Sequence, residues 1–489
     1  MSLLKRILKF LVQDKWAVCV TAFLAAAAFI VLFVPPNVGM ADNGDFNRVL
    51  GSFAIDSQTD DWYVRYFNFA HLQFDIHNPS AFFRPLILVT SHLFVIAIAK
   101  FLNMLFFSTT VFDIRFLSGL YYMVFLTSAF FIIAGFRKKT IFAKSKIACA
   151  VLALFFIFMA GDAQNLAYFN SFYSEPFSFV CFFASLAFAV WAVNRPNKNQ
   201  VFTFVGMMFF ATAFFTSKPQ YTVLAVPFVI AVVLYCKLDR KKIKTSVLAA
   251  CVVPLVLSAI IFSWVPASIS SATLFNSVFN GILRDAENVY DRLEILGLDE
   301  RFSRFAYQQI YFVWFEEGFD DYLREFEAQI SRGTVLRYYM RHPNEFIGRM
   351  QNTARVMFDS TGTEALGNFD ISQNPEPGAQ NSFFTLYSQL KELIPHTLWF
   401  IILFYVVYGV LLVFVYRKLP EVRGIIWILG TVMVMGVSQF PMPVLANGET
   451  DVGKQLFFFN LTFDMSLAAL VGVSASVLLQ KAVRMIQSP

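Results

Sequence analysis

Apolar runs long enough to cross a lipid bilayer recur along this chain of 489 residues, and they limit its fold more than any other feature. A transmembrane helix needs roughly 17 to 25 predominantly apolar residues. We expect spans at 16–36, 116–136, 146–161, 176–193, 201–216, 219–236, 245–265, 397–416, 423–445 and 461–483. A further apolar stretch, 85–107, is ambiguous. The sequence therefore predicts an all-α polytopic membrane protein with a bundle of about 10 to 11 transmembrane helices.

Composition excludes the competing class, a protein with one very large soluble core. Hydrophobic residues make up 57% of the chain and charged residues only 15%, far from the balance of a soluble domain. The five cysteines lie in apolar segments or at their edges, without CxxC spacing, so we expect neither disulfides nor a cysteine-bound metal. The net charge of +6 comes from basic loops beside anionic membrane lipid, and we assign no nucleic-acid partner to it.

These basic loops predict the orientation of the bundle, because Lys and Arg collect in cytoplasmic loops. They precede the first span and fill the connections 137–146, 237–244 and 417–423. The loops share one side of the membrane only if 85–107 does not cross, so we expect that stretch to be re-entrant or to lie in the outer interface. Both termini are then cytoplasmic, and the loop 37–84 is external. The alternative is an N-outside chain with a true span at 85–107.

Three parts are expected along the chain. They are an N-terminal membrane module, 1–265, with a catalytic external loop, 37–84; an external, mainly helical domain, 266–395; and the C-terminal membrane helices, 396–489. In the external part, apolar residues recur at helical spacing among charges, and Gly297, Gly318 and Pro343 are expected to interrupt the helices.

The first candidate site is the turn around Gly44 in the first external loop. Gly44 permits a turn that brings Asp42 and Asp45 together, and paired carboxylates suit a general base with a partner, or a shared metal. Their mutual repulsion is expected to raise the pKa of one of them. The alternative is an Asx-turn that caps a helix starting near Phe46.

Two later turns carry further polar residues on the same expected side. The turn between the third and fourth spans contains Asp162, Asn165 and Glu175, beside aromatic residues that suit either sugar binding or an interfacial belt. The turn before the last span contains Asp451 and Lys454.

Lys454, Lys218 and Arg84 are expected to be external cations at the membrane surface, where they could stabilise a lipid phosphate or simply reach toward water. The five histidines form no HxxxH or HExxH pair, so a zinc hydrolase is disfavoured.

An N-terminal span, an acidic first external loop and a late external domain together resemble the GT-C superfamily of glycosyltransferases. Four short motifs are more closely similar to bacterial WsfD-type glycan-biosynthesis hexosyltransferases. They are Asp42-Asn43-Gly44-Asp45-Phe46, Asn170-Ser171-Phe172-Tyr173-Ser174-Glu175, Leu296-Gly297-Leu298 and Gly448-Glu449-Thr450-Asp451-Val452-Gly453-Lys454.

The resemblance implies a GT-C-like bundle and an inverting transfer from a lipid-linked sugar, usually polyprenyl-phosphate hexose, at the outer face of the cell membrane. It implies that Asp45 deprotonates the acceptor, with Asp42 as its neighbour. Some relatives bind a metal through an acidic pair in a later loop, but Asp162 and Glu175 are too far apart to form a DxD pair, which leaves a divalent metal open.

The sequence thus predicts a membrane glycosyltransferase that moves a hexose from a polyprenyl-phosphate donor to a cell-surface glycan or glycopolymer. The expected substrate-binding residues are Arg84, Asp162, Asn165, Glu175, Lys218, Asp451 and Lys454. The expected partners are the donor lipid, the glycan acceptor and membrane lipid. The alternative is a transporter or flippase of a lipid-linked saccharide, but acidic residues gather in external loops rather than at span centres, which favours chemistry at the surface.

Overall fold

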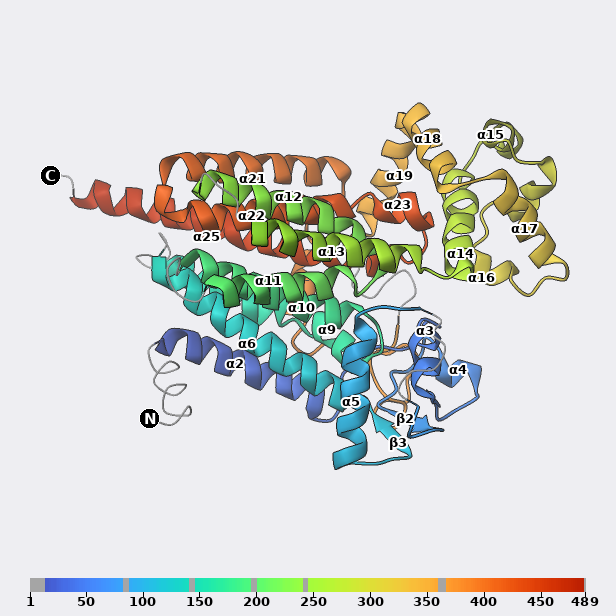
Figure 1. Ribbon diagram of the computed structural model, residues 1–489, viewed down its shortest axis with the longest axis horizontal. Coiled ribbons are helices and arrows are strands. Elements are labelled where there is room, and N and C mark those ends of the chain that lie inside the picture. The colour runs from blue at the N-terminus through green and yellow to red at the C-terminus, as the bar shows by residue number, and fades with distance from the viewer. Residues whose placement is uncertain are drawn as a thin grey trace.

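The computed structural model describes residues 14–81, 88–139, 146–194, 200–240, 245–358 and 366–487, and it shows a bundle of long helices with two groups of shorter elements at one end (Figure 1). Within these residues, eight helices are long and apolar enough to cross a membrane. They are α2 (Lys15–Phe33), α6 (Arg115–Lys139), α10 (Glu175–Asn194), η4 with α12 (Pro219–Leu224, Ala225–Arg240), α13 (Thr245–Ser263), α21 (Leu398–Lys418), η7 with α22 and α23 (Pro420–Val422, Arg423–Gln439, Met442–Asn447) and α25 (Phe457–Gln487).

Two further predicted spans are helical but do not meet this length on their own. The segment after α6 is a bent pair, in which α8 (Lys146–Leu154) and η2 (Phe155–Ala160) meet α9 (Ala163–Ala167) and η3 (Tyr168–Asn170) at 49°. Helix α11 (Gln200–Phe215) has 16 residues and packs along α10. The prediction of an all-α polytopic membrane protein is therefore confirmed, with eight or nine candidate spans among the described residues rather than ten or eleven.

Helix α5 (His92–Phe106) comes from the ambiguous stretch and lies across the end of the bundle (Figure 1). Its 15 residues are too few for a span, and it has one apolar exposed face, which includes Phe94, Phe101 and Phe106. On the opposite face Lys100 is fully buried, and its ammonium donates to the carbonyl oxygens of Phe53, Asn78 and Ala81 at 2.7, 3.0 and 2.8 Å. This geometry fits a helix in the membrane interface that holds the first external loop.

The loop 37–84 and the segment after α5 together form a small sheet that the sequence did not predict, and we call this the first external group after its expected side. Strands β1 (Ile55–Ser57), β2 (Gln73–Ile76) and β3 (Val111–Asp113) are antiparallel in the order β1-β2-β3. Short helices α3 (Asn47–Leu50), η1 (Gly51–Phe53) and α4 (Trp62–Arg65) complete the loop. Phe74 pairs with Phe112 across the sheet, and both rings pack on Phe172 from the turn before α10.

The second external group is helical and has a hydrophobic core of its own, centred on Phe275, Phe279 and Phe326. Its elements are α14 (Ala267–Ser277), η5 (Val278–Ile282), α15 (Val289–Leu296), η6 (Glu300–Phe305), α16 (Ile310–Val313), α17 (Phe319–Gln329), α18 (Arg332–Arg341) and α19 (Pro343–Arg355). Helix α20 (Leu386–Lys391) follows nearer the bundle. The breaks are where the sequence predicted them: Gly297 ends α15 and Gly318 precedes α17, both with positive φ, and Pro343 begins α19.

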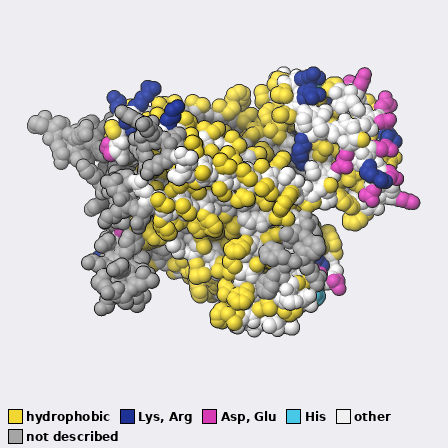
Figure 2. Space-filling model, viewed as in Figure 1, with side chains coloured by type: hydrophobic (Ala, Val, Ile, Leu, Met, Phe, Trp, Pro, Cys, Tyr) yellow, Lys and Arg dark blue, Asp and Glu magenta, His cyan; other side chains and the backbone are white. Residues whose placement is uncertain are grey.

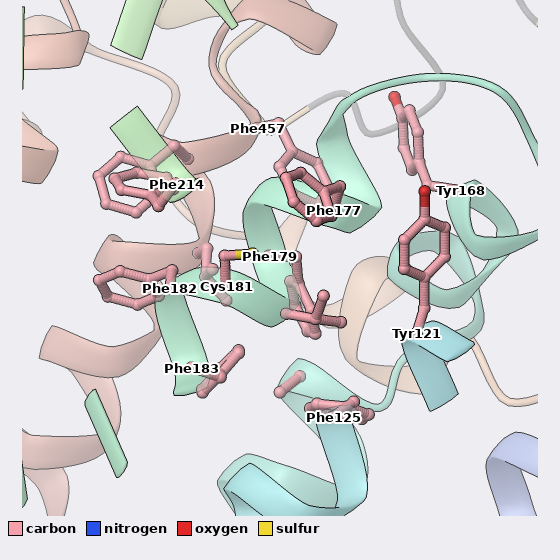
Figure 3. Close-up of a cluster of buried hydrophobic side chains, with 14 of the residues drawn as sticks. Tyr121, Phe125, Tyr168, Phe177, Phe179, Cys181, Phe182, Phe183, Phe214 and Phe457 are labelled. Carbon is pink, nitrogen blue, oxygen red and sulfur yellow. The ribbon is translucent and has the colours of Figure 1, made fainter. Parts of the chain in front are cut away.

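Aromatic rings fill the centre of the bundle, from α6 through α10 to α25 (Figure 3). Phe179 is central, with ring centroids 5.1 Å from Phe125 and 4.8 Å from Phe183. Phe182 meets Phe214 of α11 at 5.7 Å. Tilted and edge-on contacts of this kind add to the burial of large apolar surfaces, so they fix α10 as the middle of the bundle.

The two ends of the bundle differ in chemistry. Helix α2 begins and α25 ends at one end, and both external groups lie at the other (Figure 1). Figure 2 shows a hydrophobic surface along the bundle, Lys and Arg side chains at the first end, and most of the visible Asp and Glu on the external helices. The assignment of these ends to the cytoplasm and the outside stays a prediction.

That assignment can be tested with single cysteines in a variant that lacks the five native ones. Asp321→Cys, on an exposed residue of α17, should react with a membrane-impermeant maleimide in intact cells. Lys418→Cys, exposed at the other end of the bundle, should react only after the membrane is permeabilised. Labelling of Lys418→Cys but not Asp321→Cys in intact cells would show the opposite orientation.

Candidate active site

Asp45 forms ion pairs with two cations that come from distant parts of the chain. Arg48 Nη2 lies 2.8 Å from Asp45 Oδ1, and the ammonium of Lys454 donates to Asp45 Oδ2 across a separation of 409 residues. Lys454 Nζ also lies 3.9 Å from Asp451 Oδ2 and 4.8 Å from the ring centroid of Tyr173. The structure thus brings the first and last predicted polar turns together.

Asp42 shapes the turn that presents Asp45. Asp42 Oδ1 accepts hydrogen bonds from the backbone N–H groups of Gly44 at 2.7 Å and Phe46 at 3.1 Å. Gly44 has φ of 98°, a conformation that favours glycine. This is the Asx-turn of the alternative interpretation, and Asp42 is buried beneath it, with 3% of its surface exposed. A catalytic role for Asp42 stays a prediction, whereas Asp45 is the carboxylate that solvent reaches.

The two carboxyl groups have opposite pKa shifts. Burial raises the pKa of Asp42 to about 7, and the nearby charge of Asp45 adds less than burial does. The repulsion predicted from the sequence is therefore present but is not the main cause. Burial alone would raise the pKa of Asp45 as well, but the charges of Arg48 and Lys454 outweigh it and hold that pKa below its usual range. Asp45 is consequently ionised at neutral pH.

The external helices hold the turn that carries Lys454, in α24 (Val452–Gln455). Asn276 Nδ2 donates to Asn447 Oδ1 at 3.1 Å, and Asn280 Nδ2 donates to Thr450 Oγ1 at 2.9 Å. Between these contacts Glu449 is buried beside three donors: Arg349 Nη1 at 3.1 Å, Asn352 Nδ2 at 3.0 Å and Arg284 Nε at 3.3 Å. The position of Lys454 therefore depends on the second external group.

Glu175 and Lys218 form a second ion pair beside the first. Lys218 Nζ lies 2.7 Å from Glu175 Oε1, and both side chains are largely buried. The next turn connects this pair to α24, because Gln220 Nε2 donates to the backbone oxygen of Gln455 at 3.0 Å. The charge of Lys218 contributes to the low pKa of Asp45, so the two pairs belong to one electrostatic site.

Two of the predicted substrate-binding residues have other contacts. Asp162 Oδ1 accepts from Gln164 N at 2.9 Å and from Ser388 Oγ at 2.6 Å, so this carboxylate caps α9 and joins it to α20. Asn165 Nδ2 donates to the backbone oxygen of Met159 at 2.8 Å. These contacts tie the bent pair together and lie outside the Asp45 cluster. Arg84 lies outside the described residues.

A separate buried ion pair lies near Asp162. Lys391 Nζ of α20 is 2.8 Å from Asp464 Oδ1 of α25, and the Tyr387 hydroxyl donates to the same oxygen at 2.6 Å. Both charged side chains are less than a tenth exposed. The sequence analysis did not single out this pair, which joins two helices that are far apart along the chain.

Arg48 and Tyr311 are site residues that the sequence analysis missed. Arg48 lies three residues after Asp45, at the spacing of residues on one helical face, and this signal was available. Tyr311 of the second external group lies beside Arg48, and the two side chains act on each other electrostatically. No sequence pattern indicates that contact, because it joins the two external groups.

An apolar cavity of about 480 Å³ lies within the bundle, between α10, α11, α12, α13 and α22. Phe182, Phe204, Phe228 and Trp427 are among its lining residues. The lining reaches Phe214 and Phe215, which precede Lys218 by three or four residues.

The same cavity also extends to the outer surface of the bundle. Its lining includes Val201 and Val205, whose exposed fractions are 78% and 56%. The cavity therefore runs along α11, from Phe215 near Lys218 to the exposed side chains of Val201 and Val205 toward the other end of the helix.

In the described part of the chain, no group of three His, Cys, Asp or Glu side chains is placed to hold a metal ion. Within the site, Asp42 accepts backbone hydrogen bonds and Asp45 pairs with two cations.

The raised pKa of Asp42 predicts how stability depends on pH. A carboxyl group with a pKa of about 7 in the folded state and 3.8 in the unfolded state stabilises the fold below pH 3.8, and that contribution is lost as the pH rises through 7. Asp42→Asn keeps an oxygen for Gly44 and Phe46 and removes the titration. The variant should therefore lose less stability than the native protein between pH 5 and 8, by up to about 3 kcal/mol.

Thermal unfolding in detergent at several pH values measures this difference. Asp75→Asn serves as the control, and its thermal unfolding should depend on pH as that of the native protein does. Parallel pH curves for the native protein and Asp42→Asn would show that Asp42 does not titrate in this range.

Comparison with known proteins gives one match. A family model described as the YfdI N-terminal transmembrane domain matches residues 4–487. The searches of curated proteins and of solved structures found no match, so the more specific resemblance to WsfD-type hexosyltransferases has no support from them. Because the model covers nearly the whole chain, the protein belongs to the family of the YfdI N-terminal transmembrane domain.

Proposed function

We propose that this protein is a GT-C-type membrane glycosyltransferase that moves a hexose from a polyprenyl-phosphate donor to a glycan acceptor at the outer face of the membrane, with inversion at the anomeric carbon. Membership of the YfdI family is consistent with a membrane glycosyltransferase in general. One observation carries the proposal further: a partly exposed carboxylate and two lysines meet at the end of the bundle, next to a cavity that suits a lipid chain.

The chemistry follows from the charges of this cluster. The acceptor hydroxyl attacks the anomeric carbon, the bond from that carbon to the phosphate oxygen breaks, and the hydroxyl proton passes to Asp45. The phosphate leaves with its negative charge, which Lys454 and Lys218 stabilise. Asp45 is the general base on this proposal, because it is ionised and partly exposed, whereas Asp42 is buried under its own turn.

Donor binding also makes Asp45 a stronger base. Without substrate, Lys454 and Arg48 hold the pKa of Asp45 low, which weakens its tendency to accept a proton. A donor phosphate draws Lys454 toward itself and neutralises part of its charge. The pKa of Asp45 then rises, so proton transfer becomes favourable only when the donor is in place.

The cavity accounts for the lipid part of the donor. Its volume of about 480 Å³ is in the range of small-molecule sites, and its walls are mainly aromatic and aliphatic. Because the lining extends from Val201 at the start of α11 to Phe215, three residues before Lys218, an isoprenoid chain can lie along this helix with its phosphate near the lysines.

In the direct test, purified protein is incubated with a panel of polyprenyl-phosphate hexoses and with a glycan fraction from cells that make the protein. Transfer releases free polyprenyl phosphate and moves the labelled hexose to the water-soluble fraction. A flippase would move intact donor between the leaflets of a vesicle and release no free lipid phosphate. Absence of release with every donor, together with such movement, would overturn the proposal.

Asp45→Asn should lower the rate of transfer by about 10² to 10⁴, the usual contribution of a positioned base. The amide keeps the size of the side chain but cannot take the proton at that oxygen. Donor binding should persist. Asp75→Asn is the control, because Asp75 belongs to the same loop and accepts a hydrogen bond from Gln58 away from the cluster. Near-normal turnover of Asp45→Asn would place the base elsewhere.

Removal of the Lys218–Glu175 pair tests its role in donor binding. Lys218→Met with Glu175→Gln removes both charges, so neither is left buried alone. Loss of the phosphate contact should weaken use of the donor by about 1.5 to 3 kcal/mol, more than tenfold.

The matched control is Lys391→Met with Asp464→Asn, which removes a buried ion pair outside the cluster. We expect normal donor affinity in this control. Donor affinity that falls equally in both double variants would indicate that the Lys218–Glu175 pair is only structural.

A further inference from the structure

An exposed aromatic segment, residues 311–315, lies at the active-site side of the second external group. Its exposed fractions are 93% at Phe315, 70% at Phe312 and 45% at Tyr311. Ile310 and Val313 are buried in the core of the external helices and anchor the segment. Large exposed apolar side chains that are held in place by their neighbours are typical of a binding surface.

The aromatic segment adjoins the proposed base. The backbone N–H of Ile310 donates to Asn276 Oδ1 at 2.9 Å, and Asn276 Nδ2 donates at 3.1 Å to Asn447 Oδ1 in the connection that carries Lys454. Tyr311 lies beside Arg48, which pairs with Asp45. The charges of Asp45 and Asp451 also act on Tyr311. A ligand that rests on this segment is therefore beside Asp45, approaching from the external helices and not from the apolar cavity of the bundle.

A second group of exposed aromatic side chains lies in the first external group. Trp62 and Tyr63 of α4 are 64% and 54% exposed. Their helix is connected to α3, because Asn47 Nδ2 donates to the Tyr66 hydroxyl at 3.2 Å. Asn47 is the residue before Arg48 in α3, so α4 is connected to the short helix that follows Asp45.

The surroundings identify the kind of ligand. Figure 1 places α16 and α4 farther from the bundle than α5, and Figure 2 shows an indented outline between the two external groups. Glu316 and Glu317 follow Phe315 directly, and carboxylates disfavour an anionic lipid surface. A sugar ring fits this mixture, because its C–H face packs on an aromatic ring while its hydroxyl groups donate to carboxylates.

We propose that the aromatic segment 311–315 is the binding subsite for the acceptor saccharide, which stacks a sugar ring on Phe315 and Phe312 and presents its hydroxyl group to Asp45. This assignment rests on the proposed glycosyl transfer. It divides the site into a donor side, formed by the cavity and the lysines, and an acceptor side, formed by the external helices.

The probe is the water-soluble saccharide fraction that mild acid releases from membranes of the producing cells. Binding to the full-length protein in detergent is followed by saturation-transfer NMR, which needs no turnover. Phe315→Ala should weaken binding at least about tenfold, the effect of truncating an aromatic anchor. Phe315→Tyr should retain binding because the ring remains, whereas Phe315→Leu should lose it although the side chain stays hydrophobic.

The matched control is Tyr290→Ala, because Tyr290 of α15 is also an aromatic residue of the second external group and is 55% exposed. In transfer assays, Phe315→Ala should raise the saccharide concentration for half-maximal rate and leave donor dependence unchanged. No binding by the native protein, or equal binding by the native protein, Phe315→Ala and Phe315→Leu, would overturn the subsite. Binding that depends on Phe315 without release of lipid phosphate would instead retain the subsite and overturn the proposed transfer.

Discussion

Asp45, Arg48 and Lys454 form a charge cluster in which Lys454 is buried and the other two side chains are partly shielded from water, and this cluster joins the first external group to the connection before α25. A buried carboxylate or ammonium without a partner costs several kcal/mol. The first external loop supplies Asp45 and Arg48, and the connection before α25 supplies Lys454 and Asp451. These groups can leave water only together, so the electrostatics fix α3 against α24.

Other contacts hold the first external loop ready for this pairing. Lys100 of α5 donates to three backbone oxygens, and the backbone N–H of Gly39 donates to the oxygen of Asn368 at 2.8 Å. Asn170 Nδ2 donates to the oxygen of Val38 at 2.8 Å. Gly39 has little room for a side chain, since a Cβ there would lie 3.0 Å from the backbone oxygen of Asn170. A loop supported at so many points presents its carboxylate with little freedom, as catalysis requires.

The sequence predicted the helices well because a long apolar run by itself indicates a membrane-spanning helix. Helix α11 lies within one residue of its predicted bounds but is shorter than a full span, and α5 agrees with the expectation of a stretch that does not cross. The sheet was not predictable, since strands such as β1 and β3 have three residues and no clear alternation. Among the predicted site residues, the structure brings together Asp45, Glu175, Lys218, Asp451 and Lys454, while their roles stay a prediction. Asp162 was predicted with these residues, but in the structure it caps α9. Polar residues in turns commonly have this structural role, and the sequence does not distinguish it from substrate binding.

The separation of 409 residues between Asp45 and Lys454 has a consequence for synthesis of the protein. Chains fold broadly in the order in which they are made. A nascent protein that has already inserted α2 to α22 holds its base but not the lysine opposite it. On the proposed function, an interrupted chain therefore cannot consume its lipid-linked sugar, and activity begins only with the last helices. The pairing of the two loops thus makes activity depend on synthesis beyond α22.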